Sequence, residues 1–325
     1  MGYIKAEKFS YSKLNTYESC SFKYYLVYKQ GHYINAESIA IDLGVLLHAC
    51  EQQIAEYLKL NKPVDYKKLK NDFININVQG SSKDNHNLLG VKYLQEKYPE
   101  EFFKVDDRGI SYATKVQEYL EHGIYRLENY IKSHPGYVIL DTEKFFSIGF
   151  EDKTLSGFID RVIYDTYNHK YIIEDIKTKD KLFKNTELEV PLQFVVYAHA
   201  LHESMDIPYE DITCYYDLPF CDAKQLAGSP NYITKGLNRI KEIFEGTNNN
   251  EFKPNPTPLC AWCQFSPTNV NQPEEGKNLC PYYSLWRREK KVYYSANDWT
   301  GLDDYPNVLE KEINKRAKKE KEKNV

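Results

Sequence analysis

The chain has 325 residues, 42% of them hydrophobic, and a formal net charge of −4, which is typical of a soluble globular protein. It contains no run of 18 or more apolar residues, and its N-terminus lacks the apolar core of a signal peptide, which argues against a membrane span and secretion. We therefore expect a cytoplasmic protein of a bacterium or an infected host cell, with its seven cysteines reduced and available as ligands. The slight acidity excludes a coat of positive charge but is compatible with a DNA enzyme that holds metal ions on carboxylates.

The hydrophobic periodicity of the first 132 residues predicts helices. These are expected over residues 9–28, 36–60, 65–79 and 111–132. In the second of them, one stripe is expected to hold Ile41, Val45, His48, Gln52 and Ala55. The stretch 80–110 is hydrophilic and irregular, as a loop or lid would be.

Strands are predicted from residue 137 onward. Three strand-like runs, over residues 137–150, 154–166 and 170–178, are separated by short turns and should therefore pair antiparallel. A helix at 187–204 then allows a parallel crossover to a fourth strand at 211–218. The rest of the chain predicts a helix at 230–246, a Pro- and Cys-rich segment at 253–283 and a charged tail at 308–325. We expect an α/β protein with a mixed sheet flanked by helices.

Two neighbouring strands carry the residues with the clearest chemistry. Side chains alternate along a strand, so Asp175 and Lys177 point to one face, and Asp160 on the preceding strand can face the same way. Two carboxylates can bind Mg²⁺ or Mn²⁺, and a lysine can hold a water or stabilise developing negative charge. A bare Asp-x-Lys is more often a solvated pair of charges, but here the surrounding residues are apolar. Gly157 would let backbone or substrate approach closely.

This pattern resembles the core of the PD-(D/E)XK superfamily, and specifically the RecB-like exonucleases. The resemblance rests on the run Gly157-Phe158-Ile159-Asp160 and on the Asp-x-Lys motif at residues 175–177. The resemblance implies a restriction-endonuclease-like core in which the two carboxylates bind metal, Lys177 is catalytic and the carbonyl of Ile176 is a further ligand. It also implies hydrolysis of DNA phosphodiesters.

Three further motifs match the same family in order. GVLLHACEQ resembles its Gly-x-x-x-His helix and assigns His48 as a metal ligand, and DTEKFF places Glu143 at the acidic residue of the first strand. QFVVY resembles the Gln-x-x-x-Tyr motif, so Gln193 and Tyr197 share a helix face and could meet DNA or support the site. A lone histidine in a helix is more often packed, so the joint occurrence of these motifs carries the weight.

The cysteines offer a second site. Cys260, Cys263 and Cys280 taken alone fit a zinc site that lacks one ligand, or an iron–sulfur site. The segment that leads to Cys20 (SYSKLNTYESC) resembles the opening of the iron–sulfur RecB-like nucleases, such as AddB and the CRISPR-associated exonucleases, and this resemblance implies a 4Fe–4S cluster on the four. The gap of 16 residues after Cys263 is longer than in that group. The other cysteines, at 50, 214 and 221, are expected to be buried thiols.

The expected organisation is one nuclease domain over residues 1–300, with a helical region at 36–132, a catalytic sheet core at 137–220, an iron–sulfur clasp from 20 and 260–280, and a tail at 301–325. The expected function is a metal-dependent DNA exonuclease of recombination, repair or phage DNA processing, cooperating with a single-strand annealing protein or a recombinase. The alternatives are a structure-specific or CRISPR-associated trimming nuclease and a non-catalytic DNA-binding subunit. Basic residues after Lys177 and after Cys280, and tyrosines near Cys20, are candidate DNA contacts. No feature of the sequence chooses an oligomeric state.

Overall fold

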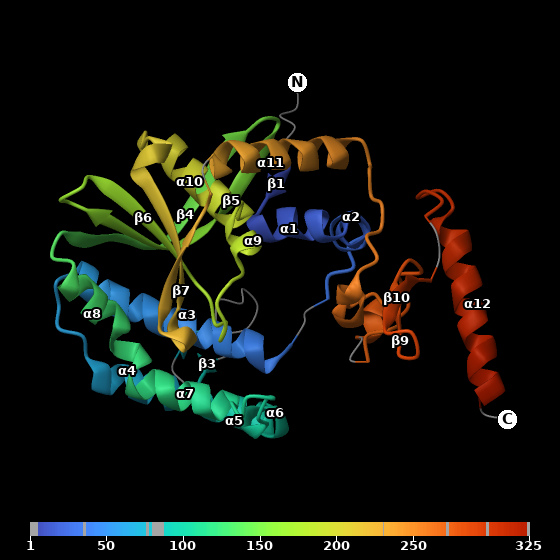
Figure 1. Cartoon of the computed structure of the whole chain (residues 1–325), viewed down its shortest axis with the longest axis horizontal. Helices are drawn as coiled ribbons and strands as arrows, with labels where there is room; N and C mark the ends of the chain where they lie inside the picture. Colours follow the sequence, from blue (N-terminus) through green and yellow to red (C-terminus); the bar gives the residue numbers. More distant parts are fainter. Residues whose placement is uncertain are drawn as a thin grey trace. The chain divides into compact units, whose positions relative to one another are not determined.

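The computed structural model describes residues 6–34, 37–75, 78–79, 88–229, 231–270, 273–296 and 299–323 (Figure 1). The chain divides into two compact units. Unit 1 comprises Met1–Tyr11 and Glu37–Asn238, and unit 2 comprises Ser12–Ala36 and Arg239–Val325. Among the described residues, no helix has the length and apolar character needed to cross a membrane.

Unit 1 is built on a mixed sheet of six strands. They are β1 (Lys8–Phe9), β4 (Tyr137–Phe150), β5 (Lys153–Asp165), β6 (Lys170–Ile176), β7 (Ile212–Leu218) and β8 (Ala223–Ala227). The order is β1-β5-β6-β7-β8, and β4 also pairs with β5. The β4, β5 and β6 pairings are antiparallel and β6 runs parallel to β7, as the sequence predicted. The short strands β1 and β8 were not expected.

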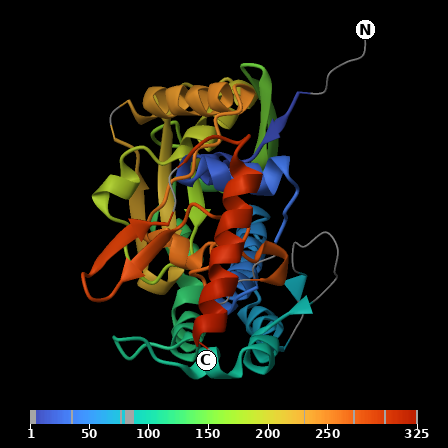
Figure 2. The ribbon, with the colours of Figure 1, turned by 90° about the vertical axis from the view of Figure 1, so that its right-hand side faces the viewer.

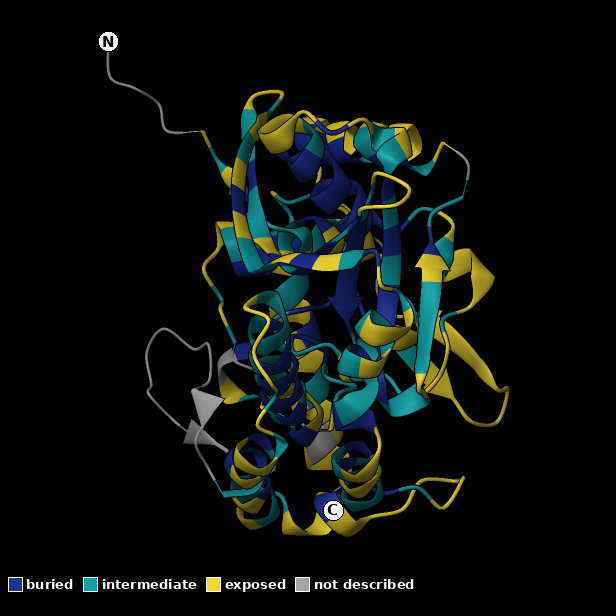
Figure 3. Ribbon diagram, turned by 90° about the vertical axis from the view of Figure 1, so that its left-hand side faces the viewer, coloured by how far each residue is buried: buried dark blue, intermediate teal, exposed yellow. Residues whose placement is uncertain are grey.

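The sheet core follows from the side-chain alternation of its strands. Buried residues, dark blue in Figure 3, run through the middle strands, whereas β4 alternates buried and exposed positions. The central strand β6 is buried from Ile172 to Ile176 on both of its faces. A strand buried on both faces can hold a charged residue only if that charge is paired, which bears on Glu174 and Asp175 below.

The helices of unit 1 lie on both faces of the sheet (Figure 1). They are α3 (Ile39–Lys59), α4 (Tyr66–Asn75), α5 (Val91–Lys97), α6 (Pro99–Phe103), α7 (Tyr112–Glu121), α8 (Arg126–Ser133), α9 (Asn185–Leu188) and α10 (Leu192–Met205), with α11 (Tyr232–Asn248) crossing into unit 2. Two-residue strands β2 (Val78–Gln79) and β3 (Leu88–Leu89) form a separate pair. Part of the predicted irregular stretch 80–110 is helical, in α5 and α6, and residues 80–87 of it lie outside the described part.

The buried face of α3 differs from the predicted stripe. Leu43, Leu47, Cys50 and Ile54 are buried in a core that also contains inward residues of β4, β5 and β6, whereas Ile41 is 48% exposed. The expected stripe was therefore rotated away from the true apolar face. His48 lies at the edge of the buried face, where it can reach the sheet while keeping contact with solvent.

Unit 2 combines two distant segments of the chain. Its elements are α1 (Tyr11–Ser19, of which the first residue belongs to unit 1), α2 (Ser21–Tyr24), a π-helical turn (Tyr25–Lys29), β9 (Ser284–Arg287), β10 (Val292–Ser295) and α12 (Tyr305–Lys323), which is red in Figure 2. The helix predicted over 9–28 is thus broken at Cys20. Tyr24 is fully buried and packs on Phe252, so it is a core residue and cannot stack on a DNA base.

Candidate metal centre

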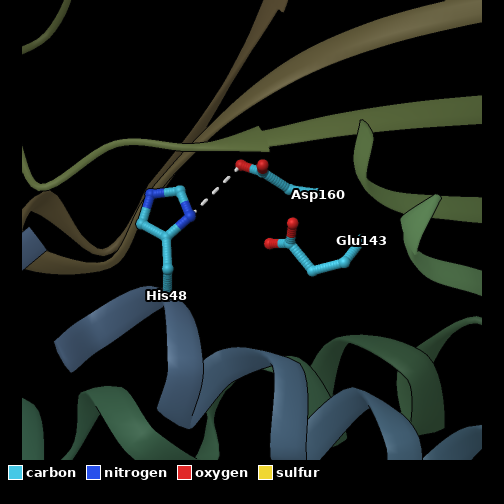
Figure 4. A group of neighbouring side chains, drawn as sticks. All are labelled: His48, Glu143 and Asp160. Atoms are coloured by element: carbon cyan, nitrogen blue, oxygen red, sulfur yellow. Dashed lines mark ion pairs between the residues drawn. The ribbon is translucent and has the colours of Figure 1, made fainter. Parts of the chain in front are cut away.

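Three potential ligands meet where α3 approaches the β4–β5 hairpin. One ligand atom from each of His48, Glu143 and Asp160 lies within 4.8 Å of the other two (Figure 4). The Nδ1 of His48 is 3.6 Å from Oδ2 of Asp160, and the same carboxylate oxygen accepts a hydrogen bond of 2.7 Å from the Ile176 amide. The structure therefore brings together residues that the sequence separates by more than a hundred positions.

The Asp-x-Lys strand adds a second carboxylate and an ammonium. Asp175 is 1% exposed, and its Oδ2 lies 2.7 Å from Nζ of Lys177. Its Oδ1 accepts a hydrogen bond of 2.6 Å from Nε2 of Gln193, which also donates to the Tyr197 hydroxyl at 2.9 Å. Gln193 and Tyr197 therefore sit beside the carboxylate, buried at the start of α10, where they orient Asp175 and leave DNA no access to them.

The electrostatics of this cluster favour a bound cation. Burial raises the pKa of Asp175 to about 7, with the charge of Asp160 adding to the shift and the ammonium of Lys177 opposing it. Burial also raises the pKa of Asp160 to about 6 and, with the charge of Asp175, raises the pKa of Glu143. Burial lowers the pKa of His48, so its imidazole is neutral and able to ligate. Carboxylates that destabilise one another in this way are relieved by a divalent ion.

The donor set fits the metal that the sequence indicated. Two or three carboxylates and one imidazole suit Mg²⁺ or Mn²⁺, both of which favour oxygen ligands. Each member of the His48, Glu143 and Asp160 group is only partly buried, so water or a phosphate oxygen has access to it. Asp175 lies close enough to interact electrostatically with all three, although it does not belong to the 4.8 Å group.

Glu143 is held in a strained backbone conformation. Its φ is +46°, in the left-handed region that residues with a Cβ rarely adopt, although it lies within strand β4. Such a conformation costs about 1 kcal/mol or more, and it persists where the surrounding structure imposes it. The break in β4 turns the Glu143 carboxylate toward Asp160 (Figure 4). Strand propensity and side-chain alternation do not predict this strain.

A buried ionic network lies directly behind the site. The guanidinium of Arg161 is 1% exposed, and it lies 2.8 Å from Glu174, 3.5 Å from Glu51 and 3.5 Å from Asp217. Three of the four residues in these contacts lie close in the chain to site residues. Arg161 follows Asp160, Glu174 precedes Asp175, and Glu51 lies nearly one helical turn after His48.

Further groups complete this network. Arg126 lies 3.0 Å from Asp217, Lys224 pairs with both Asp217 and Glu174, and the Tyr119 hydroxyl donates to Glu51 at 2.8 Å. Burial alone would raise the pKa of Asp217, but the three cations hold it well below its usual range. Sequence reasoning missed this network. The available signal was a charged residue, Glu174, inside a run of isoleucines in a central strand.

Gly157 serves packing rather than substrate approach. A Cβ at this position would lie 3.1 Å from the ring of Phe146, which occupies the space that the missing side chain leaves. The predicted close approach of backbone or substrate is therefore replaced by an aromatic side chain of the paired strand.

The four predicted cluster cysteines line one cavity in unit 2. Cys20, Cys260, Cys263 and Cys280 surround a space of about 250 Å³ whose other walls include Phe22, Leu26 and Phe265. Burial raises the pKa of the Cys263 and Cys280 thiols, and the other cysteines add to both shifts. Among the described residues, no three of these sulfur atoms come within 4.8 Å of one another.

The remaining cysteines do not share this cavity. Cys50 and Cys214 are buried in unit 1, and burial raises the pKa of each thiol to about 12. Cys221 is partly exposed, against the expectation of a buried thiol.

A known protein family matches most of the chain. A family model described as the PD-(D/E)XK nuclease superfamily matches residues 8–268. No curated protein matches the chain. Among solved structures, a protein from Eubacterium rectale described provisionally as an exonuclease has a TM-score of 0.39 and 13% identity, over 79% of this chain and 87% of that one. A protein called SSO0001 has a TM-score of 0.24 and 16% identity, over 56% and 80%. Likenesses this distant carry no argument about activity.

Proposed function

Because the chain belongs to the PD-(D/E)XK nuclease superfamily, we propose that it is a metal-dependent exonuclease that hydrolyses phosphodiester bonds from DNA ends. The observation that carries the proposal is the convergence of His48, Glu143 and Asp160 beside the Asp175–Lys177 pair. A divalent ion held there would polarise the scissile phosphate and activate water. In the hydrolysis, a water oxygen bonds to phosphorus, the bond to the leaving oxygen breaks, and that oxygen gains a proton.

The protein residues contribute position and charge to this reaction. Burial lowers the pKa of the Lys177 ammonium, but the surrounding groups, led by Asp175 and Asp160, together raise it, so Lys177 carries a positive charge at the edge of the site. About a third of its side chain is exposed, so the ammonium can reach a water or a phosphate oxygen. Gln193 fixes the orientation of Asp175. His48 is neutral and offers a nitrogen lone pair.

The direct test is degradation of end-labelled linear DNA beside covalently closed circles, with Mn²⁺ or Mg²⁺. We expect loss of linear DNA only, abolished by EDTA and by Lys177→Ala. Lys170→Ala is the matched control, because Lys170 also pairs with an aspartate and is 41% exposed, but lies at the opposite end of β6. Cleavage of circles would favour the structure-specific or trimming nuclease. Absence of cleavage of any of these substrates by folded wild-type protein would favour the non-catalytic DNA-binding subunit.

We also propose that the four cysteines of unit 2 hold a 4Fe–4S cluster with a structural role. Its support is the shared apolar cavity and the family resemblance of the segment before Cys20. Such a cluster would tie residue 20 to residues 260–280 and stabilise unit 2 by constraining a long loop, by several kcal/mol on the chain-entropy estimate. Iron and zinc analysis of protein purified without oxygen decides between the metals. About four irons per chain support the cluster, and one zinc per chain contradicts it.

The biological setting belongs to the same proposal. A stand-alone nuclease of this family would supply single-stranded ends to an annealing protein or recombinase, as a phage or mobile-element enzyme does. Co-purification of the tagged chain with such a partner from its native cell is the measurement that tests it. Recovery of CRISPR adaptation proteins instead would contradict it.

A further inference from the structure

The β4–β5 hairpin presents two aromatic rings to solvent beside the metal centre. We propose that Phe145 and Phe158 form a stacking platform for an unpaired nucleobase, next to the phosphate that the site holds. This inference rests on the proposed nuclease function, and it specifies the substrate at that site as single-stranded DNA.

The two rings contact each other, and the register of the two strands holds them in place. Phe145 and Phe158 are directly opposite each other in the register of β4 and β5, and their ring centroids lie 5.2 Å apart with an angle of 54° between the planes. Phe145 is 59% exposed and Phe158 is 52% exposed. Cross-strand aromatic pairs normally gain by burying their faces against a core, and these two do not.

The core of this hairpin is filled by other residues. Phe146 and Ile159, the chain neighbours of the pair, are 5% and 0% exposed, and Phe146 packs against Tyr197 of α10. The alternation of side chains therefore gives the hairpin one covered apolar face and one open aromatic face. Folding does not account for the rings on the open face.

The position of the pair points to a DNA base as the ligand. Phe145 is two residues from Glu143, and Phe158 is two residues from Asp160, so both rings lie about 7 Å along their strands from a candidate metal ligand. That separation is comparable to the distance from a nucleotide's phosphate to its own base or to the neighbouring base. With a phosphate at the metal centre, the adjacent base would reach the rings.

The chemistry of the surroundings favours an unpaired base over other occupants. Single-strand binding sites combine cations that hold phosphates with aromatic rings that stack on bases. Here the Lys177 ammonium, 2.7 Å from Asp175 and with about a third of its side chain exposed, supplies a cation at the edge of the site. In a duplex the base faces are covered by neighbouring bases, so a ring can stack only on a base that has left the helix. Two phenylalanines are also far smaller than the contact that a stable protein interface requires.

The test measures DNA binding apart from cleavage. Fluorescence anisotropy would follow labelled single-stranded and duplex oligonucleotides in Mg²⁺, on a Lys177→Ala background that prevents degradation. Phe145→Ala and Phe158→Ala should each weaken single-strand binding by about 5-fold to more than 100-fold, the range for loss of one stacking contact. Duplex binding should change by less than about 2-fold, because stacked bases do not reach the rings. The matched control is Phe103→Ala, since Phe103 of α6 is 61% exposed in the same unit.

Two further variants separate stacking from general apolar contact. Phe145→Leu should lose nearly as much affinity as the alanine variant, and Phe145→Trp should retain it. Wild type should bind an oligonucleotide with one abasic site at the contacted position more weakly than it binds the intact oligonucleotide. The Phe145→Ala variant should bind these two oligonucleotides equally well. Full affinity of the leucine variant would overturn the inference, and so would an equal loss on duplex DNA.

The failures are distinguishable. A protein that degrades DNA normally and binds single strands equally well with both phenylalanines replaced retains the proposed function and refutes the platform. A folded protein that neither binds nor cuts DNA refutes both. Sedimentation that shows a dimer dissociated by Phe158→Ala would assign the rings to a second copy of the chain and overturn the inference.

Discussion

Replacing Arg161 with methionine removes a buried positive charge while keeping an unbranched side chain of similar length. Glu51 would then keep only the Tyr119 hydroxyl, and Glu174 would keep only Lys224. Breaking a buried ion pair by removing one partner costs about 3–5 kcal/mol, because the remaining charge stays buried without compensation. Domains are usually stable by only about 5–15 kcal/mol, so Arg161→Met should lose a large share of the total.

The second replacement tests the cause of that loss. In the double variant Arg161→Met/Glu51→Gln, one of the uncompensated carboxylates is gone, so the two losses should not add. We expect the double variant to be less destabilised than the sum of the single variants by about 1 kcal/mol or more, as residues in one network are. Burial already raises the pKa of Glu51, and the charge of Arg161 opposes this rise. Without Arg161, protonation of Glu51 therefore removes part of the cost of its buried charge.

The assay is urea unfolding followed by far-ultraviolet circular dichroism, at low and high salt, because unit 1 contains most of the helices and the six-stranded sheet. Arg108→Met is the matched control, because the Arg108 guanidinium pairs with Asp106 and Asp180 at 2.6 Å but is about a third exposed. Loss of the Arg108 ion pairs should cost much less than the loss at Arg161 and should shrink with salt, whereas the loss at Arg161 should not. A free energy of unfolding for Arg161→Met within 1 kcal/mol of wild type would refute the reasoning.

Three other predictions concern the metal centre. Glu143→Gly should be more stable than Glu143→Ala by about 1 kcal/mol, because only glycine is free of the left-handed strain, although both variants lose the carboxylate; the reverse order in thermal unfolding would contradict the strain. Without metal, burial raises the pKa of Asp175 to about 7, so the folded state binds more protons than the unfolded state above about pH 4. The stability of wild type relative to Asp175→Asn should therefore fall as the pH rises from about 4 to about 7, and a flat difference in EDTA would show that the shift is absent. At about pH 8, Mg²⁺ at 100 times its dissociation constant should stabilise wild type by about 2.7 kcal/mol and leave Asp160→Asn nearly unchanged; equal stabilisation of both would place the ion elsewhere.

Local periodicity explains which parts of the site could be predicted. The two-residue repeat of a strand placed Asp175 and Lys177 on one side, and the four-residue repeat of a helix placed Gln193 and Tyr197 together, and both juxtapositions occur in the structure. The antiparallel and parallel pairings also followed from the lengths of the connections. The catalytic roles of these residues remain predictions.

Features that depend on strand register or on long-range packing could not be predicted from local periodicity. Nothing local relates Glu51 to Arg161, which are 110 positions apart, and a charged residue in a sequence looks the same whether solvated or paired. The exposed Phe145–Phe158 pair depends on the register of β4 and β5, because a slip of one residue would exchange the open and covered faces. The left-handed backbone at Glu143 is imposed by surrounding packing, which propensity does not describe.

The discontinuity of unit 2 has a consequence for synthesis on the ribosome. Its first segment ends at Ala36 and its second begins at Arg239, so 202 residues of unit 1 are translated between them. At about 5–20 residues per second, the first segment waits about 10–40 s for the residues that complete its core. During that time Phe22 and Leu26, both buried in the finished protein, have no native partners from the second segment.

Such a delay makes the nascent chain a client for chaperones that bind aromatic segments. It also sets the order of assembly, since Cys20 cannot join the other three cysteines of its cavity before Cys280 has left the ribosome. Chain growth therefore places completion of unit 2 after all of unit 1 has been synthesised, and a stalled chain ending near residue 238 would carry the nuclease residues without a finished unit 2.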